Sequence, residues 1–185
     1  MESAIEALSR LHPEVHLSVV HSSEQNPSLE VLHKDSADIL IMPSTTLDDH
    51  HLEHHHWRDD YVLVAARSKW PQTRNFYELV QAIRYVSWRH PGVERLHSQL
   101  ASVQLRLIHR GELSNVDTLL DLVAKGHCLS ILPRALLPEA GGAFDYVQLP
   151  IPVERRISVI ARPTSLLSNA ANAVLDILKN KASQL

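Results

Sequence analysis

The sequence predicts an α/β fold with two lobes and two segments that cross between them, and three observations lead to this prediction. Residues 115–133 show a helix, a tight turn and a buried strand in succession. Residues 15–42 show a strand, a helix and a second strand with short connections, an order that favours a parallel pair. Two apolar strands at 61–66 and 156–161 bracket the chain from 67 to 155, so the chain should pass twice between the lobes.

The first of these units carries the clearest local signals. Ser114 or Asn115 can cap the helix, because a short polar side chain accepts a hydrogen bond from the unpaired first turn. Gly126 stands where helices often end in a left-handed residue. The apolar run 129–132, stopped by Pro133, is typical of a strand covered on both faces.

The other elements follow from the spacing of apolar residues. Helices are predicted at 2–11, from 27 onward, and at 76–82, 92–101 and 168–180, with a helical turn at 136–138. Strands are predicted at 15–20, 39–42, 61–66, 85–88, 105–108, 129–132, 146–149 and 156–161. The polar stretch 45–60 is expected to be a loop.

Composition limits the class of protein. The 185 residues are 44% hydrophobic and 21% charged, which is ordinary for a globular protein, and the net charge of −3 argues against a broad nucleic-acid-binding surface. The single cysteine rules out an internal disulfide and suits a reducing compartment. No membrane helix, signal peptide or catalytic motif is recognisable. We therefore expect a cytoplasmic protein that is not an enzyme and makes no membrane contact.

Ligands of such folds bind outside the carboxyl ends of strands. Hydroxyls and backbone amides there suit a carboxylate or hydroxyl ligand, an arginine can fork onto a carboxylate, and a helix N-terminus adds a partial positive charge. The candidate ligand-binding residues are Ser22, Ser23, Ser44, Trp88, Arg89, His109, Asn115, His127 and Cys128. Each could instead be an ordinary capping or loop residue.

A histidine-rich segment is the alternative candidate site. If this segment were helical, His50 would pair with His54, and His51 with His55, at a spacing that suits zinc or nickel. No HExxH motif or nearby thiolate supports a metal site, so a solvated loop is the preferred interpretation. No metal or cofactor is predicted.

Five segments occur in a recognisable order: LHPEVHLSVV, SADILIM, YVLVAARSKWP, LLDLVAKGHCLSILP and RRISVIAR. Together they resemble the effector-binding domain of a LysR-type transcriptional regulator. The resemblance implies a two-lobed, periplasmic-binding-protein-like (type II) fold with mixed, mostly parallel sheets and two hinge segments. Lobe I would comprise 1–64 plus 163–185, and lobe II 65–162.

The resemblance also implies a function. A small-molecule effector would bind between the lobes, and the protein would form homodimers, with tetramers an option for the full-length protein. DNA would be bound through an N-terminal helix-turn-helix domain, which we expect to be absent here together with the first strand of lobe I. Cys128 departs from the family's Gly-x-Gly turn and would project toward the ligand. A solute-binding protein of a transport system is the alternative with the same architecture.

Overall fold

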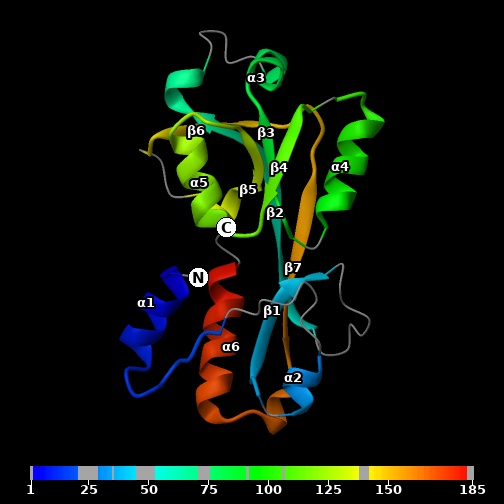
Figure 1. The fold of residues 1–185 in the computed structure, drawn as a ribbon. Helices are drawn as coiled ribbons and strands as arrows, with labels where there is room; N and C mark the ends of the chain where they lie inside the picture. The colour runs from blue at the N-terminus through cyan, green and yellow to red at the C-terminus, as the bar shows by residue number, and fades with distance from the viewer. Residues whose placement is uncertain are drawn as a thin grey trace. The chain divides into compact units, whose positions relative to one another are not determined.

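The computed structural model describes residues 2–20, 29–34, 36–44, 53–70, 76–90, 92–105, 107–137 and 142–182, and at 2–3, 109–110 and 181–182 it describes the backbone alone. The helices are α1 (Glu2–Leu11), α2 (Glu30–His33), α3 (Phe76–Ala82), α4 (Val93–Ser102), α5 (Val116–Ala124) and α6 (Asn169–Ala182). The strands are β1 (Ile39–Pro43), β2 (Glu53–Ala66), β3 (Tyr85–Trp88), β4 (His109–Leu113), β5 (Ser130–Pro133), β6 (Phe144–Gln148) and β7 (Glu154–Ala161). Figure 1 shows these elements.

The chain forms two compact units, one of residues 1–58 with 156–185 and one of residues 59–155. Strands β2 and β7 pass from one unit to the other, so they are the two crossing segments. The predicted lobe boundaries at 64/65 and 162/163 fall several residues further along the chain than this division. Among the residues that the structure describes, no helix is long and apolar enough to cross a membrane.

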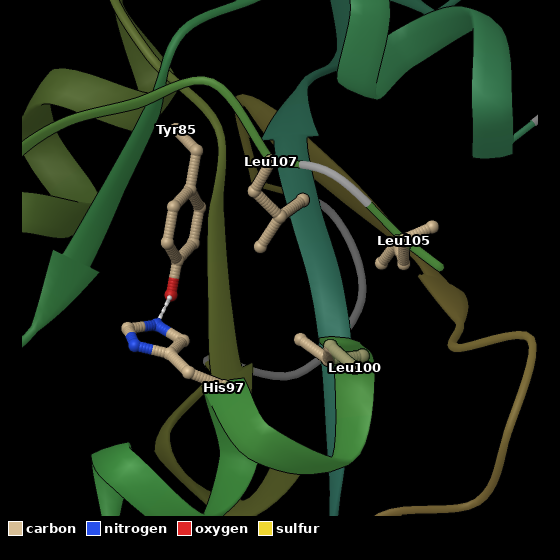
Figure 2. Close-up of a pocket in the computed structure, with 5 residues that line it drawn as sticks. All are labelled: Tyr85, His97, Leu100, Leu105 and Leu107. Carbon is tan, nitrogen blue, oxygen red and sulfur yellow. Dashed lines mark hydrogen bonds between the residues drawn. The ribbon is translucent and has the colours of Figure 1, made fainter. Parts of the chain in front are cut away.

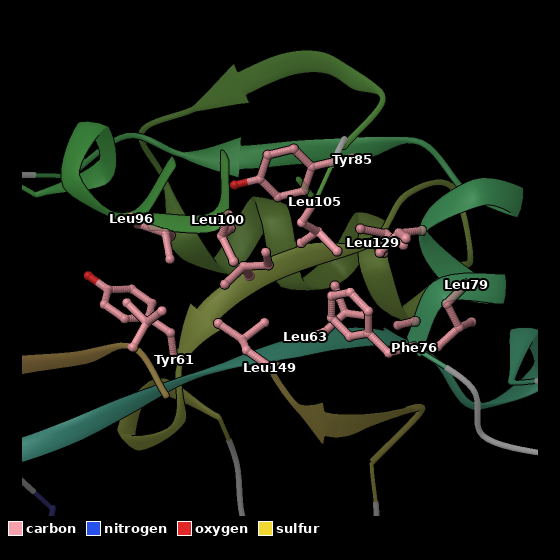
Figure 3. Packing of buried hydrophobic residues seen from close by; sticks show 14 residues of the cluster. Tyr61, Leu63, Phe76, Leu79, Tyr85, Leu96, Leu100, Leu105, Leu129 and Leu149 are labelled. Carbon is pink, nitrogen blue, oxygen red and sulfur yellow. The ribbon is translucent and has the colours of Figure 1, made fainter. Parts of the chain in front are cut away.

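In the unit of 59–155, strand β2 is buried on both faces. Tyr61, Leu63 and Ala65 contribute to one core cluster, whereas Val62 and Val64 contribute to another on the opposite face. Strands β5 and β6 both pair antiparallel with β2. Figure 3 shows the larger cluster, to which α3 and α4 also contribute. The two-sided burial explains why the run 61–66 is apolar at every position.

The unit of 1–58 and 156–185 is built around the antiparallel pair of β1 and β7. Val159 and Ala161 of β7 pack in a cluster with Leu175 of α6, and Ile160 packs with Leu32 of α2 in another cluster. Helix α1 packs against α6 through a third cluster. Burial on both faces again accounts for the apolar residues 159–161 of β7.

Two predicted strands are wrong. Residues 15–20 have no regular structure, and Val20 is 85% exposed. The β-branched residues favour a strand, but a strand needs a partner, and none of the described residues pairs with this segment. The predicted parallel pair of 15–20 with 39–42 is therefore not formed. The pairs β1–β7, β2–β5 and β2–β6 are antiparallel and the pair β3–β4 is parallel, so the sheets are mixed.

The strand predicted at 105–108 lies instead at β4, 109–113. Helix α4 ends in a left-handed residue, Gln104 with φ 57°, and the Leu105 N–H donates to the Leu100 carbonyl at 3.2 Å. This is the hydrogen bond of a Schellman helix end, which here lacks the usual glycine. Leu105 thus closes the helix by packing in the core, and the strand begins later.

The loop predicted at 45–60 is wrong for its second half, since β2 begins at Glu53. Polar residues rarely favour strands, but β2 lies beside β7 in the sheet, and sheet pairing overrides weak propensity. Residues 45–52 lie outside the described residues.

Candidate functional site

The carboxyl edge of the parallel pair β3 and β4 carries the most varied polar chemistry in the unit of 59–155. The two strands end side by side, because the Arg89 N–H donates to the Leu113 carbonyl at 2.8 Å. The Trp88 indole Nε1–H donates to the Ser114 carbonyl at 3.1 Å. These bonds hold Trp88, Arg89 and Ser114 together, as expected where parallel strands end.

Three aromatic rings stack beside this edge. The His90 ring lies 4.6 Å from the Trp88 ring and 5.7 Å from the Tyr61 ring, centroid to centroid, with interplanar angles below 30°. His90 is 9% exposed, whereas Trp88 is half-buried. Burial raises the pKa of Tyr61 to about 12, so its hydroxyl stays protonated at neutral pH. The three rings thus form one aromatic stack beside the edge.

Two features at the same edge are electropositive. Arg89 carries a positive charge, and Asn115 begins helix α5, whose dipole is positive at this end. The Arg89 guanidinium forms an ion pair with the Glu112 carboxylate, and both side chains are partly exposed. Asn115 caps α5, since its Oδ1 accepts a hydrogen bond from the Thr118 N–H at 2.8 Å. The predicted cap is thus confirmed. An anion approaching this edge would meet the helix N-terminus, but it would compete with Glu112 for Arg89.

Ser44 lies in the other unit, directly after β1, within a network of polar side chains. Its hydroxyl bonds with the Ser158 hydroxyl at 2.6 Å, and Ser158 donates to the Glu53 carboxylate at 3.1 Å. Because Ser158 has one proton and gives it to Glu53, Ser44 must be the donor in the first bond. Among the described residues no group donates to Ser44, so its hydroxyl oxygen can act as an acceptor.

Glu53 is the centre of that network. Arg156 donates to both of its carboxylate oxygens, at 2.7 and 2.9 Å. Burial alone would raise the pKa of Glu53, but hydrogen bonds from Arg156 and Ser158 and the nearby charges of Arg156 and His56 outweigh it, so the pKa is lowered. Glu53 thus stays ionised at neutral pH and anchors β2 to β7.

The turn after α5 has the predicted backbone but an unexpected side-chain arrangement. Gly126 is left-handed, with φ 75°, and the His127 N–H donates to the Leu122 carbonyl at 3.1 Å, as in a Schellman motif. His127 is exposed. Cys128 is 3% exposed and packs in the core cluster of Leu119 and Val123, so its thiol points into the protein and not into solvent. Burial raises the pKa of this thiol.

His109, His127 and Cys128 lie at the opposite ends of the strands from Trp88 and Arg89. β3 and β4 are parallel, and Tyr85 forms a parallel bridge with Leu129, just before β5. His127 and Cys128 precede β5, so they lie at the amino ends of these strands. His109 begins β4 and also lies at that end. The prediction that all three follow a strand on the carboxyl side is therefore corrected.

The histidine segment is a strand where the structure describes it. His54 and His55 are neighbours in β2, so the helix on which the conditional metal pairing depended is not present at these two residues. The His54 Nε2 lies 3.2 Å from the Ala161 carbonyl oxygen and 3.0 Å from that of Arg162, and so acts as a donor to the end of β7. No group of three or more metal-ligating residues occurs among the described residues. His50, His51, Ser22 and Ser23 lie outside them.

Three residues that contribute to these sites were missed in the sequence. His90 could have been found from its spacing, because it lies two residues after Trp88 and adjoins the predicted strand end. Glu53 and Ser158 had no local signal, since they are far apart in sequence and meet through pairing of β2 with β7.

Comparison with known proteins identifies the family. Residues 1–183 match the family described as LysR substrate binding domain. The structure is similar to the effector-binding domain of QuiR in complex with shikimate, with TM-score 0.71, 12% identity, and coverage of 99% of this chain and 90% of that one. It is similar to the cofactor-binding domain of the Cbl transcriptional regulator, with TM-score 0.73, 15% identity, and coverage of 96% and 81%.

A third similar structure is the regulatory domain of OxyR2 from Vibrio vulnificus, with TM-score 0.69, 15% identity, and coverage of 99% of this chain and 88% of that one. The search of curated proteins finds no match. At identities this low, the structural likeness shows that the fold is shared and nothing more. The predicted α/β class of periplasmic-binding-protein-like (type II) fold is confirmed.

Proposed function

Because the chain belongs to the LysR substrate-binding domain family, we propose that it senses a small-molecule effector for a bacterial transcriptional regulator. The observation that carries this proposal is the family match over residues 1–183. It favours a regulator over the alternative of a transport protein. The effector would act by differential binding, stabilising one arrangement of the domain over another.

The proposed effector is a small metabolite with carboxylate or hydroxyl groups. Supporting this class, the edge of β3 and β4 offers the Arg89 guanidinium, the N-terminus of α5 and the aromatic stack of Trp88 and His90. Ser44 offers acceptor lone pairs in the other unit. QuiR binds shikimate, a hydroxylated carboxylic acid, which makes shikimate the first compound to test.

Thermal melting is the direct test of effector binding. A ligand at 100 times its dissociation constant stabilises a protein by about 2.7 kcal/mol. For a chain of this size, that raises the melting temperature by roughly 5–10 °C. The screen should include shikimate, other hydroxylated acids, matched amines and zinc. A shift with an acid supports the proposal, whereas a shift with zinc alone would move the site to the histidine segment.

Site variants then locate the binding residues. Arg89→Ala should weaken binding of an acidic effector about tenfold or more by removing a charge-assisted hydrogen bond. Asp121→Ala, which removes an exposed carboxylate paired with Lys125, is the control and should bind normally. Unchanged affinity in Arg89→Ala and in Ser23→Ala would refute the site assignment. Ser22 and Ser23, which lie outside the described residues, remain predictions. His109, His127 and Cys128 lie at the opposite ends of the strands and are not assigned to this edge.

Homodimerisation is the proposed route by which the signal reaches DNA. Exposed apolar side chains support it: Leu17, Val19 and Val20 of the segment 15–20 are 37%, 45% and 85% exposed. Clustered exposed apolar residues typically mark association surfaces. In sedimentation velocity, Val20→Asp should weaken the dimer, whereas Leu166→Asp, at a separate exposed leucine, should not.

The remaining features of the proposal concern the whole regulator. DNA would be contacted through a helix-turn-helix domain separate from residues 1–183, and the regulator would act in the cytoplasm, where its target genes are. A role without catalysis is proposed on the same basis. The test is to assay this chain for DNA binding alone and after fusion to a helix-turn-helix domain.

A further inference from the structure

The Arg89–Glu112 ion pair joins the carboxyl ends of β3 and β4 through side chains. The register of the parallel pair places Glu112 opposite Ser87. Because alternate residues of a strand share a face, Arg89 lies on the face of Ser87, and the Arg89 guanidinium donates to the Glu112 carboxylate there. Among the side chains that the structure describes, Arg89 is the cation that pairs with Glu112.

This pair is an accessible part of a face that is covered elsewhere. At the amino end of β3 the Tyr85 ring extends toward α4, and its hydroxyl lies 2.9 Å from the His97 Nε2 (Figure 2). Tyr85 is buried and lines a pocket together with His97, Leu100, Leu105 and Leu107. Burial raises the pKa of Tyr85, and the nearby Tyr61 and Glu112 add to this effect, which fits the place of Glu112 on the same face. At the other end, the Arg89 and Glu112 side chains are 56% and 33% exposed, so a solute can reach both.

We propose that a small zwitterion of the α-amino acid type inserts between Arg89 and Glu112, so that this edge prefers an amino acid to the plain acid of the same skeleton. The inference rests on the proposed function and names the class of effector more closely. The ligand carboxylate accepts hydrogen bonds from the Arg89 guanidinium, and the ligand ammonium group donates to the Glu112 carboxylate. Both members of the opened pair thus regain a charge-assisted hydrogen bond.

The charges of the pair decide between ligand classes. Opening the pair costs little, because ion pairs between partly exposed side chains contribute weakly to stability. A plain carboxylic acid that binds Arg89 leaves Glu112 beside a second carboxylate, and at about 4 Å in water such a like-charge contact weakens binding about fivefold. An amine that binds Glu112 meets the same penalty beside Arg89. A ligand that carries both charges avoids both penalties.

The test compares compounds that differ by one charged group, using backbone amide shifts on the intact chain at low ionic strength. The pairs are L-alanine with propionate and L-phenylalanine with 3-phenylpropanoate, and 2-phenylethylamine serves as the compound without a carboxylate. In at least one pair the amino acid should bind wild type about fivefold more tightly than the plain acid, with shifts at Arg89 and Glu112. The amine should bind more weakly than L-phenylalanine.

Glu112→Gln preserves the shape of the side chain and removes its charge. The variant should bind the amino acid more weakly and the plain acid more tightly, so the roughly fivefold preference should fall to about one. The matched control is Asp121→Asn, which makes the same change of charge in an exposed ion pair with Lys125 and should keep the wild-type preference. A residue with a merely structural role would not change the ratio of the two affinities.

Failure of this inference differs from failure of the proposed function. Equal or weaker binding of the amino acid in both pairs would overturn the inference, as would a preference that Glu112→Gln leaves intact. If shikimate or a plain acid nevertheless binds and Arg89→Ala weakens it, the domain still senses an acid at this edge. Absence of binding by every acid and amino acid at millimolar concentration would overturn both.

Discussion

Replacing Asp59 by asparagine should destabilise the unit of 59–155 strongly. Asp59 and Arg155 are the first and last residues of that unit, and they form a buried ion pair. The Arg155 Nε and Nη2 both donate to Oδ2 of Asp59, at 3.0 and 2.8 Å. Oδ1 accepts from the Ala135 N–H at 3.0 Å. The aspartate therefore ties together β2, β7 and the turn after β5.

The Asp59→Asn substitution preserves shape but replaces the acceptor of two hydrogen bonds from Arg155 by a donor. An asparagine oxygen can still accept from Ala135, but its amide NH₂ would then face the two Arg155 donors. The guanidinium, whose side chain is 17% exposed, would keep its charge without a partner. Breaking a buried pair by removing one charge costs about 3–5 kcal/mol. Because Arg155 retains some contact with water, we expect the lower end, about 3 kcal/mol.

Urea denaturation followed by circular dichroism and tryptophan fluorescence measures this loss, which corresponds to a drop in melting temperature of roughly 6–12 °C. The double variant Asp59→Asn/Arg155→Met should recover most of the loss, because it removes the stranded charge. Asp121→Asn, in an exposed pair with Lys125, should cost less than about 1 kcal/mol. A loss below about 1 kcal/mol in Asp59→Asn would refute the reasoning, as would additive losses in the double variant.

Four further predictions concern single residues. The lowered pKa of Glu53 contributes stability that is present above its ordinary value of 4.5 and is lost as the pH falls through the folded-state pKa. Glu53→Gln should therefore flatten the acid limb of a plot of urea midpoint against pH. Cys128 should react with Ellman's reagent only after denaturation, because its thiol is buried and its pKa is raised. Gly126→Ala should cost about 1–2 kcal/mol in urea denaturation, because φ is 75° and the new Cβ would lie 3.0 Å from the Cε of Lys69. Asn115→Ala should cost about 1 kcal/mol through loss of the cap, and Asn115→Ser should restore most of it.

Elements with their own local signals were predictable. Helices α1 and α3 and strand β3 begin and end at the predicted residues, and Asn115 and Gly126 cap α5 as expected. These features depend on contacts between residues a few positions apart. The spacing of apolar and capping residues in the sequence therefore predicts them directly. The order of elements, and with it the fold class, followed from them.

Features that depend on distant partners were not predictable in the same way. The segment 15–20 has strand propensity but no partner among the described residues. The run 105–108 is apolar because Leu105 closes α4 and Leu107 lines a pocket, which a strand pattern does not distinguish. Cys128 was expected to face a ligand, but helix α5 and β2 together enclose its thiol. Each of these outcomes was decided by packing between elements far apart in sequence.

Strand β2 illustrates the difference within one element. From Tyr61 to Ala66 the strand is stabilised by burial of apolar side chains on both faces, and the sequence of this half predicts a strand. From Glu53 to Asp60 it is polar, and Glu53, His54 and Asp59 instead form specific bonds to β7, to the chain that follows it, or both. Those partners lie about a hundred residues away, so no local pattern reveals them. The polar half of the strand should therefore depend on single charged residues, whereas the apolar half should tolerate conservative hydrophobic exchanges. Comparing Asp59→Asn with Val62→Ile in the same denaturation assay tests this contrast, since equal losses would show that both halves are held by packing.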